Sequence, residues 1–320
     1  MPPRDQRRVT DQEFAMMFQT HGAVGLAKIL NQTERNIHMR RNNVEARLGV
    51  RLVPPPKGEL HIAPTDAPML EIEHKDGVAL VASDGHYWPG PATTAHRALV
   101  KLSRDLKPKL VIFNGDAFDG ATISRHPPIG WESLPTVDDE LAAVQERLGE
   151  IVKVTPRARH IWPLGNHDAR FNTKLAVAAP EFRDVSGTRL VHHFPDWEPC
   201  WAVSLGGRRG AVIKHRWKGG IHAPHNNTVG AGRTMVTGHL HSQKCTPYTD
   251  YNGTRWGVDT GCIAWPGGRQ FGYTEANPLN WRSGFAVLTW AGGELLPPEL
   301  VTVLDEEKGT VSFRGNVIRV

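Results

Sequence analysis

The chain has 320 residues, with 38 Lys and Arg against 33 Asp and Glu, which gives a formal net charge of +5. This length predicts one large α/β domain with a small appendage, and a hydrophobic fraction of 39% argues against a disordered chain. No apolar run approaches the roughly 20 residues that cross a bilayer, and no apolar segment follows the basic N-terminus. We therefore expect neither a membrane span nor a signal peptide.

The basic excess lies in the first part of the chain. Residues 1–57 hold ten basic and five acidic side chains, and this difference of five equals the net charge of the whole protein. A local basic excess favours a polyanionic partner, although a solvated basic helix has the same composition. The three cysteines (Cys200, Cys245 and Cys262) are an odd number at wide spacing, which indicates a reducing, cytoplasmic compartment.

Apolar spacing predicts three helices near the N-terminus, at Asp11–Gln19, Ala23–Leu30 and Glu34–Leu48. Gly22 is expected to end the first helix and so separate it from the second, and Thr33 is expected to cap the third. Val24, Leu26, Ala27 and Leu30 are expected to point inward, as are Ile37, Val44 and Leu48, with Arg35, Arg40 and Arg41 toward the other face.

Residues 22–49 resemble a helix-turn-helix domain, similar to small ones at the N-terminus of some phage proteins. The resemblance predicts a DNA-contacting module at 1–53, in which Arg35, Arg40 and Arg41 contact nucleic acid. The alternative is a helical packing or dimerisation module, so a homo-oligomer is also compatible with the sequence. Pro54, Pro55 and Pro56 then predict a stiff linker at 54–74, followed by the large domain at 75–320.

Beyond the linker, short buried strands alternate with helices, which predicts an α/β domain. The expected strands lie at 78–82, 110–113, 160–163, 211–213 and 234–236, and the expected helices at 93–106 and 137–152. The last third of the chain is strand-rich.

Metal-binding side chains follow five of these strands. The motifs are Asp84 and His86 in DGH, Asp116 and Asp119 in GDAFD, Asn166 to Asp168 in GNHD, His215 after AVIK, and His239 and His241 in GHLH. Sites in open α/β sheets form outside the carboxyl ends of strands, so these loops are expected to converge. Asp84 and His86 are expected to point the same way, as alternate residues of an extended segment do.

Carboxylate, imidazole and carboxamide ligands together suit Mn, Fe, Zn or Ni better than Mg alone. Each motif taken alone is also compatible with a capping turn or a buried core histidine. Five of them in this order, each after a strand, predict a metal centre.

The five motifs resemble those of the calcineurin-like metallophosphoesterase superfamily, over about residues 80–263. The resemblance implies a four-layer double β-sandwich with helices outside and two divalent transition metals, manganese being the first choice. It assigns Asp84, His86 and His241 to one metal, Asn166, His215 and His239 to the other, and Asp116 to both. His167 would be the catalytic acid, Asp168 the residue that orients it, and Asp119 a carboxylate behind the ligands.

One departure concerns the fourth motif, where many members of that family have His-Gly and this chain has His215 followed by Arg216. His222 and His225 lie close behind and are alternative ligands. We favour His215 because it directly follows a strand, as the histidine of the family does.

The resemblance implies a phosphoesterase that uses a hydroxide held between the metals for in-line attack on phosphorus. Aromatic and basic residues in the site loops favour nucleic acid: Trp88, Arg125, Arg170, Arg216 and Trp217. We therefore expect a DNA nuclease or another phosphodiesterase, in the bacterial host cytoplasm if phage-encoded. The alternatives are a phosphomonoesterase acting on phosphoprotein or small nucleotides, and a catalytically dead DNA-binding scaffold.

Overall fold

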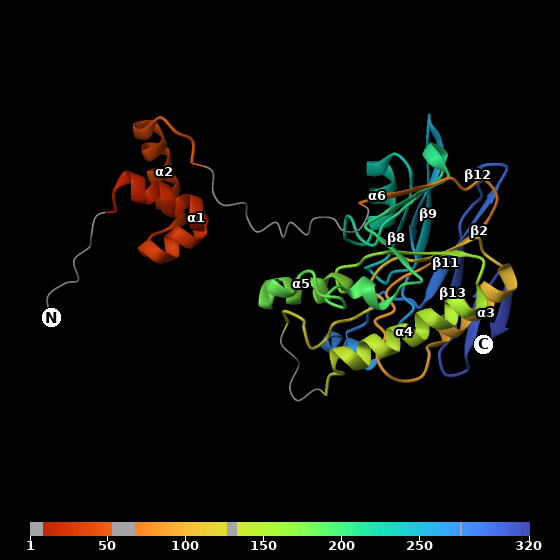
Figure 1. The fold of residues 1–320 in the computed structure, drawn as a ribbon. Helices are drawn as coiled ribbons and strands as arrows, with labels where there is room; N and C mark the ends of the chain where they lie inside the picture. The colour runs from red at the N-terminus through yellow and green to blue at the C-terminus, as the bar shows by residue number, and fades with distance from the viewer. Residues whose placement is uncertain (1–8, 53–67, 127–132, 276) are drawn as a thin grey trace. The chain divides into compact units, whose positions relative to one another are not determined.

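The computed structural model describes residues 9–52, 68–126, 133–275 and 277–320. The chain divides into two compact units, Met1–Thr65 and Asp66–Val320, of which the first is red and orange in Figure 1. The predicted linker at 54–74 lies largely outside the described residues. Its last part is wrong, because Leu70–Ile72 forms strand β1 and pairs in parallel with a strand of the second unit.

Among its described residues, the first unit contains helices α1 (Asp11–Leu30) and α2 (Glu34–Leu48). Gly22 interrupts α1 with φ 64° and ψ −176°, so the predicted break is confirmed. Thr33 caps α2 by accepting a hydrogen bond from the backbone N–H of Asn36, at 3.3 Å. A small apolar core holds the helices together and includes Phe14, Phe18, Leu26, Ile37 and Val44.

Two expectations about the faces of these helices are wrong. Val24 and Leu48 are not inward, since they are 49% and 37% exposed. Arg40 and Arg41 do not lie on a face away from the core. Their guanidinium carbons stand 4.7 Å and 5.7 Å from the ring centroids of Phe14 and Phe18, where they cover the core by cation–π contact.

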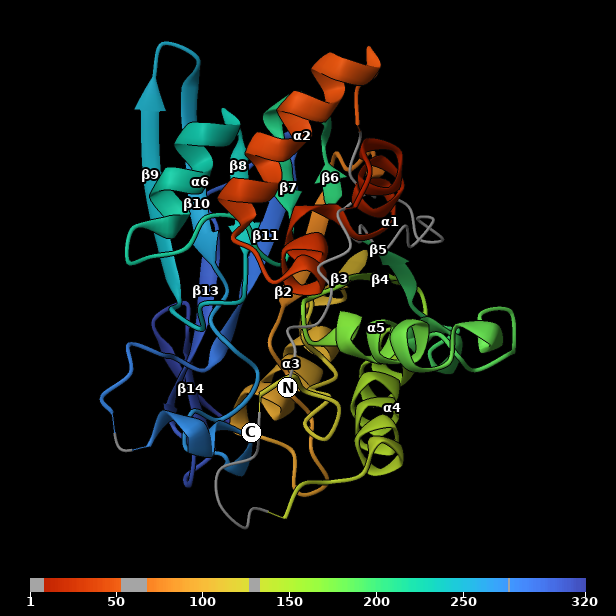
Figure 2. The ribbon, with the colours of Figure 1, turned by 90° about the vertical axis from the view of Figure 1, so that its left-hand side faces the viewer.

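The second unit is a mixed α/β domain, as predicted, built from two sheets and four longer helices among the described residues (Figures 1 and 2). Its helices are α3 (Thr94–Leu106), α4 (Val137–Val154), α5 (Asp168–Ala178) and α6 (Ala223–Ala231). Its further strands are β2 (Gly77–Ala82), β3 (Leu110–Phe113), β4 (Arg159–Pro163), β5 (Glu198–Cys200), β6 (Val203–Leu205), β7 (Ala211–Ile213), β8 (Thr234–Thr237), β9 (Lys244–Asp250), β10 (Gly253–Asp259), β11 (Gly284–Ala291), β12 (Glu294–Leu295), β13 (Glu299–Asp305), β14 (Thr310–Phe313) and β15 (Asn316–Arg319).

Strand order shows why the metal-binding loops meet. One sheet runs β1-β6-β7-β8-β10-β9, and the other runs β15-β14-β13-β11-β2-β3-β4-β5, with β12 on β11. Strands β2, β3 and β4 are parallel, and so are β7, β8 and β10. Within each parallel set the carboxyl ends therefore lie at one edge of the sheet.

Alternating side chains divide the strands between two cores. Val81, Ile112 and Leu288 of the larger sheet pack with Ile213 and Val258 of the smaller sheet. The opposite face of the larger sheet packs against α3 and α4, and this core includes Leu80, Val111, Phe113, Leu99 and Val144. The two sheets thus share one apolar interior, and α3 and α4 cover the outer face of the larger one.

Helix α6 covers the smaller sheet and contacts β8, β9 and β10. It comes so close at Gly257 that a Cβ there would lie 2.1 Å from the carbonyl oxygen of Pro224. The neighbouring Val258 points into the interior shared by the two sheets, so α6 lies on the other face. Among the described residues, no helix is long and apolar enough to cross a membrane.

Candidate metal centre

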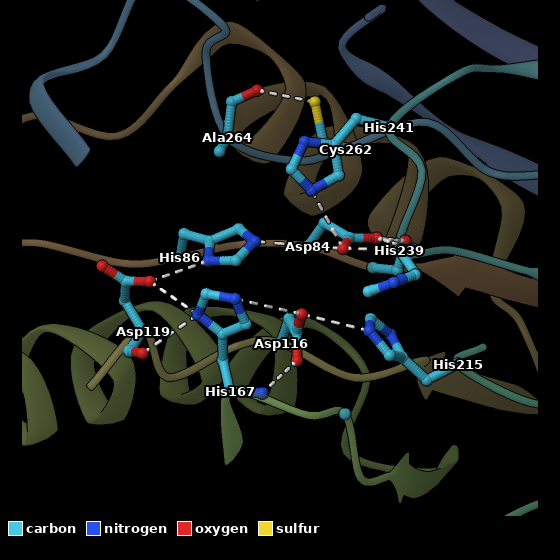
Figure 3. Close-up of polar contacts among 12 residues, drawn as sticks. Asp84, His86, Asp116, Asp119, His167, His215, His239, His241, Cys262 and Ala264 are labelled. Carbon is cyan, nitrogen blue, oxygen red and sulfur yellow. Dashed lines mark hydrogen bonds and ion pairs between the residues drawn. The ribbon is translucent and has the colours of Figure 1, made fainter. Parts of the chain in front are cut away.

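Loops after five strands of the two sheets bring their polar side chains together at one place. Figure 3 shows Asp84 and His86 from the β2 loop, Asp116 and Asp119 from the β3 loop, and His167 after β4. They face His215 after β7 and His239 and His241 after β8. The sheets therefore unite the predicted residues, although these are spread along the chain from Asp84 to His241.

The first candidate ligand set is Asp84, His86 and His241, whose ligand atoms all lie within 4.8 Å of one another. All three residues are at most 5% exposed. The Asp84 carboxylate accepts hydrogen bonds from the backbone N–H of His239, at 2.9 Å, and from the Ser83 hydroxyl. The Nε2 atom of His241 is 3.1 Å from Oδ1 of Asp84.

The second candidate set is Asp116, His215 and His239, also within 4.8 Å of one another. The Nε2 atom of His215 is 3.0 Å from Oδ2 of Asp116. On the far side of the ring, Nδ1 of His215 lies 2.8 Å from the carbonyl oxygen of Asn114. A carbonyl can only accept, so Nδ1 carries the proton and Nε2 keeps its lone pair for a metal.

The buried atoms without a hydrogen-bond partner fit two metal ions. Among the described residues they include Nε2 of His86, Nε2 of His215 and Oδ1 of Asn166, which belong to three of the residues that the resemblance assigns as ligands. Leaving such atoms unpaired in the interior costs about 1–3 kcal/mol each, and a coordinated cation removes that cost. Imidazole with carboxylate and carboxamide oxygen suits Mn, Fe, Zn or Ni.

The ligand loops have an unusual backbone. Positive φ occurs at nine described non-glycine residues, and five of these are the candidate ligands Asp84, His86, Asp116, His239 and His241. Asp84 and His86, at φ 55° and 39°, are therefore not the extended pair that the sequence predicted. Such conformations cost about 1–3 kcal/mol each and persist where surrounding contacts hold them.

Glycines next to the ligands are required by space. A Cβ on Gly165 would lie 2.0 Å from Oδ1 of Asp116, and one on Gly115 would lie 2.4 Å from Nδ1 of His215. Likewise, a Cβ on Gly238 would lie 2.5 Å from Oδ2 of Asp84. The glycines of three motifs thus let the loops come close enough together for their candidate ligands to meet.

Electrostatics keep the carboxylates ionised. Burial raises the pKa of Asp84, but the charges of His241 and His215 outweigh it and lower that pKa to about 2. The pKa of Asp116 is likewise lowered despite burial, chiefly by His215 and His167. Burial lowers the pKa of His215, whereas Asp116 and Asp84 raise it to about 10. The negative charge of Asp84 and Asp116 therefore favours cations at this edge.

His167 is oriented by Asp119. Its Nδ1 atom lies 2.8 Å from Oδ1 of Asp119, the same oxygen that lies 3.1 Å from Nδ1 of His86. The other carboxylate oxygen accepts the indole N–H of Trp88 at 2.9 Å. His86, Asp119 and His167 also lie close enough together to be a third candidate ligand set. Hydrogen bonds already pair these side chains with one another, so we assign no third ion to them. Arg170 donates to the Asp119 carbonyl at 2.9 Å and lies 3.1 Å from Nε2 of His167.

Asp168 does not orient His167, so that expectation is wrong. Its carboxylate accepts hydrogen bonds from the backbone N–H groups of Asp116 and Gly165, both at 2.8 Å, and from the Trp162 indole at 3.1 Å. A fourth comes from the backbone of Phe118, at 3.1 Å. Asp168 begins α5 with its side chain turned inward, where it ties together the loops after β3 and β4.

A cleft of about 980 Å³ lies beside His167 and Asn166. The predicted contacts Trp88, Arg125, Arg170 and Arg216 line it. Trp217 is not among its lining residues and is 47% exposed. The sequence reasoning missed Lys174, Arg269 and Tyr273, which also line the cleft. The aromatic and glycine-rich stretch at 265–273 was the signal for the last two.

The alternative fourth ligands lie outside the candidate sets. His222 is exposed and stands at the N-terminus of α6, while the ring of His225 packs against Tyr248 with centroids 5.5 Å apart. His215 is 1% exposed and belongs to the second set.

Comparison with known proteins finds phage relatives, and no family model matches the chain. The Gene 54 protein of Mycobacterium phage D29 is 25% identical in an alignment of 246 positions, which covers 70% of this chain and 92% of that protein. The Gene 54 protein of Mycobacterium phage L5 is 28% identical in an alignment of 174 positions, which covers 49% of this chain and 65% of that protein.

Two solved structures are also similar to the chain. Vps29 from Entamoeba histolytica, complexed with Zn²⁺, has a TM-score of 0.40 and 14% identity, covering 75% of this chain and 98% of its own. A dimetal phosphatase from Danio rerio has a TM-score of 0.33 and 10% identity, covering 72% and 96%.

We expect Asp168→Asn to destabilise the protein, because an amide nitrogen would replace one oxygen among four N–H donors. The free energy of unfolding in urea should fall by at least about 2 kcal/mol, and bound metal should fall with it. Asp138→Asn, at an exposed position in the first turn of α4, is the matched control and should stay within about 0.5 kcal/mol. Unchanged stability with an altered pH–rate profile would instead return Asp168 to the role of orienting His167.

Proposed function

We propose that this protein is a dinuclear-metal-dependent phosphodiesterase of the calcineurin-like type, with its layers arranged as the double β-sandwich of that family, and that its substrate is DNA. One observation carries the proposal. A buried array of carboxylate and imidazole ligands, with unpaired ligand atoms, lies beside a cleft lined by Arg125, Arg170, Lys174, Arg216 and Arg269. Metal ligands and cations in one cleft suit a phosphate ester.

The geometry supports a specific assignment of ligands. Asp84, His86 and His241 would hold one metal, and Asn166, His215 and His239 the other. Asp116 would be shared by the two, since its carboxylate lies 3.0 Å from His215 of the second set and its charge also acts on Asp84 and His86 of the first. Two divalent metals, with manganese as first choice, would supply a water nucleophile near neutral pH and charge to neutralise the phosphate.

His167 would protonate the leaving oxygen. Burial lowers its pKa, yet Asp116 and Asp119 together raise that pKa above its ordinary value, which favours the protonated ring. Its Nδ1–H donates to Asp119, and Nε2 faces the cleft, where it accepts from the Arg170 guanidinium at 3.1 Å. Nε2 would take up its proton once a phosphate oxygen replaces it as the partner of Arg170. Arg170 is placed to hold a phosphate oxygen next to the proton donor.

Two other functions make different predictions. A phosphomonoesterase acting on phosphoprotein or small nucleotides would use the same metals. A dead DNA-binding scaffold would be expected to lack a ligand, whereas six of the seven candidate ligands lie in two close groups and the seventh, Asn166, lines the adjoining cleft. The number of cations along the cleft favours a substrate with more than one phosphate over a monoester.

The test is hydrolysis of bis(p-nitrophenyl) phosphate, p-nitrophenyl phosphate and DNA with Mn²⁺, before and after chelation. We expect faster hydrolysis of the diester than of the monoester, cleavage of DNA, and loss of all activity on chelation. Asp116→Asn should be inactive, since it weakens both sites. Activity on the monoester alone would move the substrate to phosphoprotein or nucleotide, and no activity with bound metal would favour the scaffold.

We expect His167→Ala to retain bound metal and to hydrolyse the diester about 10²–10⁴-fold more slowly, because it loses the proton donor. Metal content and kcat are both measured on the purified variant. His222→Ala removes an exposed histidine outside the cleft and should match the wild type. An unchanged kcat in His167→Ala would overturn the role of His167.

The helices of the first unit are proposed to act as a helix-turn-helix module that binds DNA. The exposed polar side chains of α2 support this, among them Arg35, Asn36, His38, Asn42 and Asn43, which carry hydrogen-bond donors suited to bases and phosphates. Arg40 and Arg41 are less suited, because they cover Phe14 and Phe18. A DNA substrate would place the protein in the host cytoplasm, given its phage relatives.

We expect Arg35→Ala to weaken DNA binding and to lower the slope of log affinity against log salt by about 1, because one phosphate contact is lost. Arg209→Ala removes an exposed arginine from the second unit and is the matched control. Fluorescence anisotropy with labelled duplex, over a range of salt, measures both. Equal affinity and slope in Arg35→Ala would favour a dimerisation role for α2.

A further inference from the structure

Three segments of the second unit enclose the cleft beside His167. Residues 121–126 and helix α5 form one part of its lining, and the short 3₁₀ helix Arg269–Thr274 contributes another. Arg269 also donates a hydrogen bond to the carbonyl of Ser133, at 3.2 Å, which ties this helix to the residues before α4. A volume of about 980 Å³ is at the upper end for a site that surrounds a small organic ligand.

The cleft is strongly cationic. Five arginine and lysine side chains line it, and Asp119 is the one carboxylate among the described lining residues. Both oxygens of Asp119 are already engaged by the ring N–H groups of His86, His167 and Trp88. Arg125, Lys174 and Arg269 are exposed and, for a substrate with several phosphates, can pair with those on either side of the reacting one.

Trp88 provides a fixed aromatic surface in this cleft. Its indole N–H donates to Oδ2 of Asp119, at 2.9 Å, while Oδ1 of the same carboxylate holds His86 and His167. The shared carboxylate therefore fixes the position of the Trp88 ring relative to the candidate ligand His86 and to His167, the proposed proton donor. Because the Trp88 ring is only partly buried and lines the cleft, it is available to a planar group of the substrate.

Tyr273 provides a second aromatic surface, which is also tied to the metal centre. It is 57% exposed, and its ring packs against Phe271 with centroids 6.3 Å apart. Phe271 is buried between two candidate ligands, with centroid distances of 5.3 Å to His86 and 5.5 Å to His241. Phe271 thus anchors the 3₁₀ helix against the candidate ligands, and Tyr273, two residues later, lines the cleft.

We infer that the cleft binds an unpaired DNA strand, with bases stacked on Trp88 and Tyr273 and flanking phosphates held by Arg125, Lys174 and Arg269. This inference rests on the proposed phosphodiesterase function. Stacking on aromatic side chains between basic groups is how proteins hold single strands. The bases of a duplex are stacked on one another and do not offer their faces, so single-stranded DNA should be cleaved faster than duplex.

The test compares an oligodeoxythymidylate, the same strand annealed to its complement, and a strand of equal length with abasic sites, each with Mn²⁺. Bis(p-nitrophenyl) phosphate is measured in parallel as a report on the metal centre. We expect the single strand to have a kcat/KM at least about tenfold above that of the duplex and of the abasic strand, because stacking of each base contributes that much.

Tyr273→Leu keeps an apolar side chain and removes the ring. It should lower kcat/KM for the single strand about tenfold or more, and this loss should shrink on the abasic strand, where there is no base to stack. Tyr273→Phe keeps the ring and should restore the rate. Tyr251→Leu removes an exposed tyrosine at the turn between β9 and β10, outside the cleft, and is the matched control.

The outcomes separate the inference from the function on which it rests. Diester hydrolysis with equal or faster cleavage of duplex, or equal losses in Tyr273→Leu on normal and abasic strands, would overturn the single-strand inference and leave the phosphodiesterase in place. If neither the diester nor any DNA is cleaved by metal-loaded protein, the proposed function itself is wrong.

Discussion

Buried negative charge at the shared edge of the two sheets is the constraint on which this site depends. Asp84, Asp116, Asp119 and Asp168 are each at most 6% exposed, and burying unpaired carboxylates is costly. Asp168 is compensated by four N–H donors, and Asp119 by three ring N–H groups. Asp84 and Asp116 instead face histidines whose Nε2 atoms have little other pairing, so their compensation is suited to metal cations.

Much of this arrangement could be predicted from the sequence because each motif follows a short run of apolar residues. Val78, Val111 and Val236 belong to such runs, and parallel pairing of the strands brings their ends together. Asp119 lies behind the candidate ligand His86, as predicted, but the role of orienting His167, which the resemblance assigns to Asp168, belongs to Asp119. Asp168 is next to His167 in sequence, but Asp119 in another loop is next to it in space, and only the packing of β3 against β4 determines that.

Other features lacked a local signal. Helix α6 (APHNNTVGA) contains glycine and two asparagines, which are weak helix formers, and its packing on Gly257 and its neighbours supports it. Strand β1 is three residues long and is defined by its pairing with β6. Arg40 and Arg41 look like free surface charges in a helical projection, whereas their long side chains reach the rings of another helix. Tertiary contacts decide each of these cases.

The same carboxylate that orients His167 also fixes Trp88, so one group holds both the proposed proton donor and the proposed base-stacking ring. A shift of Asp119 would displace His86, His167 and Trp88 together, because all three rings bond to its two oxygens. On the other side, Phe271 links His86 and His241 to Tyr273 through ring contacts. Binding a base on either aromatic surface would therefore act on the ligand geometry, and ordered ligands would in turn preorganise both surfaces for a strand.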